Sequence, residues 1–210
     1  ATLPLAEAFK ANFTGTDIKD VNVEHSKTHN AYVNLINGDT DLILVTYPSE
    51  EEQKIAKEKG VELEIVPIVK EAFVFFVSTD NPVENLTLKQ VQDIYTGQIK
   101  NWKDVGGANE KIIAYQRPEN SGSQSGMLSL VMKGKKMMTP TTETISQTME
   151  DIVNVISDYS NSKNAIGYSY YYYATKMYTT DKMKLLAIDG VDPTYENIQT
   201  GLYGIQTAYY

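Results

Sequence analysis

The segment 117–125, RPENSGSQS, carries the residues best suited to bind an anion, because an arginine, a glycine and two hydroxyls fall within seven positions. Arg117 offers a planar fork of donors for two oxygens. The Ser121 and Ser123 hydroxyls can rotate toward an oxyanion. A helix beginning just after Ser121 would leave its first N–H groups unpaired, with positive partial charge, and Gly122 would allow close approach to the backbone. The pattern favours an anion site over its alternative, an ordinary N-cap at Ser121 with a solvated Arg117.

Two other hydroxyls stand just before expected helix starts. Thr2 precedes Pro4, and Thr28 precedes the segment HNAYVNLING. Each by itself is more often a helix cap than a ligand contact. Three such starts in one α/β chain could meet at the carboxyl ends of the strands, where open sheets bind small molecules. We therefore expect these helix starts to converge on one ligand.

Catalytic and metal-binding patterns are weak. Ser121 lies in NSGS rather than GxSxG, and neither histidine is an obvious base for it, so a hydrolase built on Ser121 is the weakest hypothesis. The segment lacks the lysine of a Walker phosphate loop. His25 and His29 are four residues apart without an HExxH pattern. We expect no enzyme activity, no metal and no cofactor, although sequence alone does not exclude a glycosidase carboxylate pair.

Composition narrows the class of protein further. The 210 residues carry 19 Lys+Arg and 27 Asp+Glu, a formal charge of −8, which argues against a nucleic-acid partner. With 41% hydrophobic and 22% charged residues the chain should fold. The absence of cysteine removes disulfides and thiolate chemistry. No apolar run approaches the roughly 20 residues that span a bilayer.

Helices that could position these residues are indicated by apolar spacing and stop signals. One begins near Pro4, and three others cover residues 29–38, 49–60 and 86–97, each ending at a glycine. Further helices are expected from just after Ser121 to roughly Val131, at the start of segment 151–178, and at its tyrosine-dense end.

Strands alternate with these helices. DLILVTYP predicts a buried strand ending near Tyr47, and residues 61–69 and 71–79 are strand-like, the second too uniformly apolar to be half exposed. Short strands are expected at 111–116, 165–168, 183–191 and 201–210. Helix alternating with buried strand predicts an α/β fold with a parallel or mixed sheet. The tyrosines between residues 168 and 178 favour packing, with hydroxyls at the wet edge, over ligand stacking.

The chain resembles the PstS-like phosphate-binding proteins of ABC transporters. LTLKQVQDIYTGQIKNWKDVGG followed by RPENSGSQS carries the resemblance most strongly. ATLPLAEAF, NLINGDTDLILVTYPSEEE and NAIGYSYYYYA add to it in the family's order over nearly the whole chain.

The resemblance implies a two-lobed, type II periplasmic-binding-protein fold with a ligand cleft between its lobes. Lobe I would be discontinuous, with residues 1–77 plus 180–210, and lobe II would contain residues 78–179. The turn signal at Asp80–Pro82 agrees with the first crossing between them.

The ligand contacts implied by the resemblance are those of a dehydrated oxyanion held by amides, hydroxyls and one arginine. Arg117 matches the family's arginine, while Ser121, Gly122 and Ser123 match its Ser-Gly-Thr/Ser turn. Thr2 and the amide of Leu3 match the start of the first helix, and Thr28 matches the hydroxyl that opens the second, with Ser26 as the substitute if the loop register differs by two.

Two carboxylate positions bear on ligand choice. A carboxylate accepts a hydrogen bond from phosphate, which still carries protons at neutral pH, and repels fully deprotonated sulfate. The family's best-known members carry an aspartate where this chain has Thr46. Glu119 matches another acidic family position and is the candidate proton acceptor, with an ion pair to Arg117 as the alternative. The alternative function is therefore the same scaffold binding another oxyanion or small acid, or acting as a surface signalling or adhesion module.

The resemblance also implies location and partners. Family members have a strand before the ATLPL-type segment, so we expect a trimmed form or another way of filling that edge. The missing part would hold the signal and any lipid-anchoring cysteine, which makes the protein an extracytoplasmic lipoprotein. Its expected partners are inorganic phosphate and a membrane permease, with the protein itself a monomer.

Overall fold

The computed structural model describes residues 8, 10–12, 22–119, 121–141, 144–146, 148–158, 162–177 and 180–210. The chain forms two compact units. Unit 1 comprises Ala1–Val69, Asn120–Gly122 and Ala208–Tyr210, and unit 2 comprises Lys70–Glu119 and Ser123–Thr207. The boundaries of these units differ from those of the two lobes expected from the sequence. The two lobes stay a prediction.

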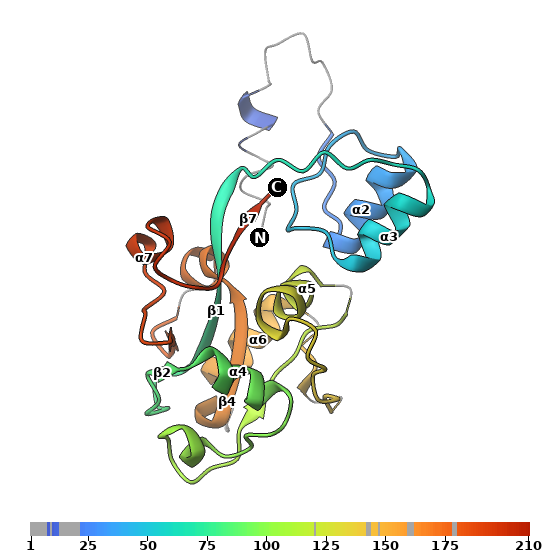
Figure 1. Cartoon of the computed structure of the whole chain (residues 1–210). Helices are drawn as coiled ribbons and strands as arrows, with labels where there is room; N and C mark the ends of the chain where they lie inside the picture. The colour runs from blue at the N-terminus through green and yellow to red at the C-terminus, as the bar shows by residue number, and fades with distance from the viewer. Residues whose placement is uncertain are drawn as a thin grey trace. The chain divides into compact units, whose positions relative to one another are not determined.

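Unit 1 is built on two helices that pack side by side, α2 (Thr28–Asn37) and α3 (Glu50–Glu58) (Figure 1). α2 ends at Gly38, whose φ of 80° is the left-handed conformation that glycine adopts without strain, as the sequence predicted. α3 starts with a capping box between Ser49 and Glu52. The buried side chains between these helices and the following segment form one cluster: Tyr32, Ile36, Val45 and Ala56.

Two expected strands of unit 1 are not regular strands. The segment 41–48 contributes a single bridge, Thr46 to Tyr209, flanked by reciprocal 2.9 Å backbone bonds between Val45 and Tyr210. Its apolar Leu42 is 57% exposed, so the prediction of a buried strand was wrong. Residues 61–68 are also outside any regular strand, and Val66 and Ile68 are more than half exposed. A strand needs a neighbour to pair with, and sequence periodicity does not reveal whether one is present.

Unit 2 is organised around β1 (Val69–Ser78), whose residues from Glu71 to Ser78 are all buried, as expected. β1 pairs antiparallel with β4 (Ala165–Tyr170) and β5 (Met183–Leu185), and β4 pairs parallel with β3 (Ile113–Ala114). The strand order is β3-β4-β1-β5, with β7 (Gln206–Tyr209) also on β1. The sheet is therefore mixed, one of the two predicted forms.

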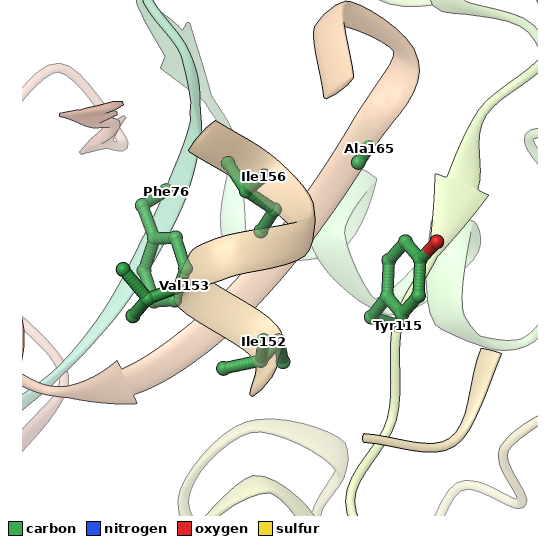
Figure 2. Packing of buried hydrophobic residues seen from close by; sticks show 6 residues of the cluster. All are labelled: Phe76, Tyr115, Ile152, Val153, Ile156 and Ala165. Carbon is green, nitrogen blue, oxygen red and sulfur yellow. The ribbon is translucent and has the colours of Figure 1, made fainter. Parts of the chain in front are cut away.

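Helices complete this unit. α4 (Leu88–Tyr95) and α6 (Met149–Asp158) were both expected, and α6 packs on β4. Figure 2 shows the cluster that α6 forms with the strands and the residue after β3, which contains Phe76, Tyr115, Ile152, Val153, Ile156 and Ala165. Gly167 of β4 makes this close packing feasible, because a Cβ there would lie 2.5 Å from Ile156 Cδ1.

The remaining elements are short. A two-stranded parallel sheet joins β2 (Asn85–Leu86) to β6 (Ala187–Ile188), and α7 (Tyr195–Gln199) precedes β7. A 3-10 turn, Trp102–Val105, buries the single tryptophan. The expected helix after Ser121 is α5 (Gly122–Gly126), continued by the π-helical segment Met127–Met132. Of the expected first helix, residues 8 and 10–12 are helical and its start lies outside the described residues.

Candidate anion-binding site

Arg117 is held in unit 2 by both its backbone and its side chain. Its backbone N–H donates to the Tyr168 hydroxyl at 3.0 Å and to Gln124 Oε1 at 3.2 Å. Its side-chain NH1 donates to the Ser146 carbonyl at 2.9 Å. Its Nε is buried and has no hydrogen-bond partner among the described residues. The guanidinium is therefore fixed on one side and retains an unused donor, which contradicts the alternative of a solvated surface residue.

The hydroxyl that supports Arg117 is deeply buried. Tyr168 is fully buried, and its ring contacts Phe73, Phe75 and Tyr95 at centroid distances between 5.5 and 6.3 Å. Its hydroxyl accepts from the Arg117 N–H and donates to Gln124 Oε1. Burial raises the pKa of Tyr168 above its ordinary value, while the Arg117 N–H and charge act in the opposite direction. The expectation of packing holds for Tyr168 and Tyr170, which are buried, whereas Tyr172 is 42% exposed and Tyr178 lies outside the described residues. A hydroxyl at the wet edge was wrong for Tyr168.

Burial and neighbouring side chains shift the pKa of Arg117 in opposite directions. Burial lowers the pKa of Arg117 from its ordinary value, and interactions with Tyr168, Tyr173 and Asp151 raise it. An arginine guanidinium keeps its charge at neutral pH even so. A partly buried cation with an unused, buried Nε–H attracts an anion more strongly than a fully exposed one, because water screens it less.

In unit 1, Gly122 brings the start of α5 against two threonines. A Cβ at Gly122 would lie 2.5 Å from Thr28 Oγ1 and 3.2 Å from Thr46 Oγ1. Thr28 is the first residue of α2, and the N-cap is Lys27, which makes no side-chain cap bond. Thr28 thus stands one position later than expected and does not serve as the cap. Only a glycine allows the backbone and both hydroxyls to lie this close.

The other predicted site residues are distributed as follows. Ser121 and Ser123 are buried, with 7% and 5% exposure, on either side of Gly122. Glu119 is exposed and has no ion pair with Arg117 among the described residues. Ser26 is exposed as well. Thr2 and Leu3 lie outside the described residues. The structure therefore brings together Thr28 and Gly122 in unit 1, while Arg117 and Ser123 belong to unit 2.

Sequence reasoning missed the residues that orient Arg117. Gln124 and Tyr168 are separated by 44 positions and meet only through the fold. No local pattern distinguishes Tyr168 from its neighbouring tyrosines.

Among the described residues, no three side chains of the His, Asp or Glu type gather to hold a metal ion. His29 Nδ1 lies 3.0 Å from the Glu52 carboxylate, so this ring nitrogen contacts Glu52. In the same described ranges no helix has the length and apolar character needed to cross a membrane. What the site offers are donors: backbone amides, hydroxyls and one guanidinium.

The chain is thus a mixed α/β protein of two compact units, with hydrogen-bond donors suited to an anion at the starts of α2 and α5. The model of the PBP superfamily domain matches residues 1–210, so the chain belongs to this family. The predicted periplasmic-binding-protein-like fold is thereby confirmed.

Similar proteins agree with this membership. The chain is 34% identical to the phosphate-binding protein PstS of Bacillus subtilis over 129 residues, 61% of this chain and 40% of that protein. It is 29% identical to PstS of Staphylococcus saprophyticus over 99% of this chain and 65% of that protein. The chain thus spans less than two thirds of the length of these relatives.

Solved structures show the same similarity. A Clostridium perfringens structure, described as a phosphate ABC transporter substrate-binding protein with bound phosphate, has a TM-score of 0.79 and 26% identity over 99% of this chain and 80% of that one. An ABC-type phosphate transport receptor from Vibrio cholerae shares the fold, with a TM-score of 0.72 at 23% identity over 99% of this chain and 79% of that chain. These proteins are named for binding and transport, not for catalysis.

Proposed function

We propose that this chain is a solute-binding protein that captures inorganic phosphate and delivers it to the permease of an ABC transporter. Its ligand contacts would be Thr28, Ser121 and Gly122 of unit 1 and Arg117 and Ser123 of unit 2, with Thr2 and the Leu3 amide completing the set. Glu119 would accept a hydrogen bond from a protonated oxygen of the ligand. The chain carries out no turnover and needs neither metal nor cofactor.

One observation carries this proposal: Gly122 places the start of α5 against the Thr28 hydroxyl at the start of α2. The first N–H groups of a helix have no acceptor within it, and the helix dipole adds positive partial charge there. α2 shows this directly, because its first backbone bond joins the Ala31 N–H to the Lys27 carbonyl. Two such starts with hydroxyls between them suit a small oxyanion.

Support also comes from the relatives. Those named as phosphate-binding proteins match along most of this chain, and the Clostridium perfringens structure contains phosphate. By the same analogy, we propose that the protein works outside the cytoplasmic membrane as a monomer, held there by a lipid anchor, with no nucleic-acid partner.

Calorimetric titration of phosphate into the wild type and Arg117→Ala tests the proposal. A hydrogen bond to a charged group contributes about 1.5–3 kcal/mol net, so losing the guanidinium should weaken binding by about tenfold or more. Lys103→Ala is the control, since Lys103 is an exposed cation of the same unit and should leave affinity unchanged.

A second variant is needed to distinguish loss of binding from loss of folding, because the Arg117 side chain also donates to the Ser146 carbonyl. Ser123→Ala removes one hydroxyl and retains Arg117, and it should weaken phosphate binding severalfold. Unaltered phosphate affinity in both Arg117→Ala and Ser123→Ala would remove these residues from the site. A wild type that binds no phosphate would refute the function itself.

A further inference from the structure

A group of exposed cations on unit 2, which we call the lysine patch, lies near α4. Three of its members stand on the loop after the π-helical segment Met127–Met132, and one follows α4: Lys133, Lys135, Lys136 and Lys100. None of the four has an ion pair among the described residues. Lys89 of α4, by contrast, is paired with Asp93 at 2.6 Å. The patch therefore keeps its positive charge.

Contacts with α4 bring the members of the patch together. Lys135 Nζ donates to Gln92 Oε1 of α4. Just past the end of α4, a Cβ at Gly97 would lie 3.4 Å from Met138 Sδ and 3.9 Å from Lys100 Cε. The loop and Lys100 thus border the same helix, and their side chains form one surface.

Acidic residues are scarce in this part of the sequence. The segment 120–142 holds three lysines and no aspartate or glutamate. The wider segment 85–142 has eight Lys+Arg against four Asp+Glu, a net charge of +4 in a chain whose total is −8. Because salt screens exposed charges beyond about 8 Å at physiological ionic strength, a surface that meets the patch interacts with this local charge more than with the total.

The backbone of Lys133 is unusual for a lysine. Its φ of 48° and ψ of 53° are left-handed, a conformation that glycine adopts at little cost and other residues rarely adopt. The next residue, Gly134, also has a positive φ, of 85°. A lysine here costs stability relative to a glycine, so its side chain is better explained by an interaction of the surface than by folding.

We infer that the lysine patch binds the surface of a membrane that contains anionic phospholipids, an inference that goes beyond phosphate capture and does not depend on it. A lysine is a hydrated point charge on a flexible stem, which suits many mobile headgroups at once. A single acyl chain binds a membrane only marginally, and a basic patch is a suitable second contact. The patch would therefore strengthen the proposed lipid anchor.

The composition of the patch favours a membrane over an acidic protein. Protein–protein hot spots are dominated by tryptophan, tyrosine and arginine, and the patch contains none of these. An exposed apolar side chain stands beside the lysines instead. Leu128 is 41% exposed, and its carbonyl accepts the Lys133 N–H at 2.9 Å. An apolar side chain next to lysines can enter the boundary between headgroups and acyl chains.

Co-sedimentation of the whole chain with lipid vesicles in phosphate-free buffer tests this inference. Vesicles of phosphatidylcholine alone are compared with vesicles that also contain phosphatidylglycerol. The chain should bind only the second kind, and binding should fall as the salt concentration rises from about 0.01 M to about 0.15 M, because the screening length shortens from about 30 to about 8 Å. Inorganic phosphate added at matched ionic strength should leave vesicle binding unchanged, since free phosphate is not the ligand of the patch.

A double variant locates the binding surface. Lys133→Gly combined with Lys136→Gln should weaken vesicle binding by about 25-fold, because each lysine at an anionic surface contributes about fivefold, the equivalent of about 1 kcal/mol. Lys54→Gln combined with Lys57→Gln changes the net charge equally at exposed positions of α3 and should leave binding unchanged. Since Lys133→Gly relieves the left-handed conformation, it should unfold at the same or a higher urea concentration than the wild type, which separates lost binding from misfolding.

Each other outcome overturns the inference. Equal binding to both kinds of vesicle, or no binding to phosphatidylglycerol at low salt, would exclude an anionic membrane as the partner. Equal weakening by the two double variants would show that binding follows net charge rather than the patch. Absence of vesicle binding together with lysine-dependent binding of poly-glutamate would assign the patch to an acidic protein. A wild type that binds no phosphate refutes the proposed function and leaves this inference standing.

Discussion

Because the carboxyl group of Glu71 is buried, we expect unit 2 to lose stability as the pH rises from 4.5 to about 6. Its side chain begins the buried part of β1 at 2% exposure, and its carboxylate accepts the backbone N–H groups of Ala72 at 2.9 Å and Tyr172 at 3.2 Å. Burial raises the pKa of Glu71 to about 6 from an ordinary 4.5, against the lowering effect of these N–H groups. The folded protein therefore holds this proton more tightly than the unfolded chain does.

The sign and size follow from proton linkage. Between pH 4.5 and about 6 the folded state binds more protons at Glu71 than the unfolded state, so the free energy of unfolding falls as the pH rises. The stabilisation is complete below pH 4.5 and is lost once the pH exceeds about 6. A difference of about 1.5 pKa units corresponds to about 2 kcal/mol.

Urea unfolding at a series of pH values from 4 to 7, each pH a choice of the assay, checks this prediction. Fluorescence of Trp102, the single tryptophan, which is buried in unit 2, reports the unit that contains Glu71. The difference in unfolding free energy between wild type and Glu71→Gln should change by about 2 kcal/mol across this range. Glu62→Gln, an exposed glutamate of unit 1, serves as the control. An equal pH dependence in wild type and Glu71→Gln would refute the reasoning.

Three further substitutions probe the packing that positions the site. Tyr168→Phe removes the hydroxyl that joins Arg117 to Gln124, so urea unfolding should show a loss of about 1–3 kcal/mol, and phosphate should dissociate faster in stopped-flow mixing; unchanged values would contradict the assigned support. Gly167→Ala places a Cβ 2.5 Å from Ile156 Cδ1 and should cost about 1–3 kcal/mol in the same assay, and a stability equal to wild type would show that α6 can move away freely. Ser49→Ala should cost about 0.5–2 kcal/mol through the lost cap of α3, measured by circular dichroism during thermal unfolding, and no change in helix melting would exclude the cap as a determinant.

The helices and the central strand were predictable from sequence because their signals are local. Ser49 with Glu52 forms the expected kind of helix start, and Gly38 ends α2 in the conformation its residue type favours. The apolar run of β1 is buried along its length for the same reason. The segments 41–48 and 61–68 also carry strand-like patterns and still lack regular pairing, since pairing depends on neighbours distant in the chain.

Part of the candidate site is also indicated by local sequence, and part is not. One short segment contains Arg117, Ser121, Gly122 and Ser123, and its residue types and spacing predict an anion site. The contribution of Thr28 required the knowledge that it meets Gly122 across 94 positions of sequence, which only packing supplies. Thr46 shows most clearly what sequence cannot predict, because only the fold reveals that its hydroxyl is buried without a hydrogen-bond partner among the described residues.

The aromatic core of unit 2 and its arginine are one structural system. Phe73 of β1 packs against Tyr168 of β4 at 5.5 Å, and Tyr95 of α4 packs against the same ring at 5.6 Å. These contacts leave Tyr168 few alternative positions, and its hydroxyl holds the Arg117 N–H. The backbone of a loop residue is thereby fixed by the most buried part of the sheet. Because a rigid donor loses less conformational entropy on binding than a mobile one, we expect this core to raise the phosphate affinity that we propose for Arg117.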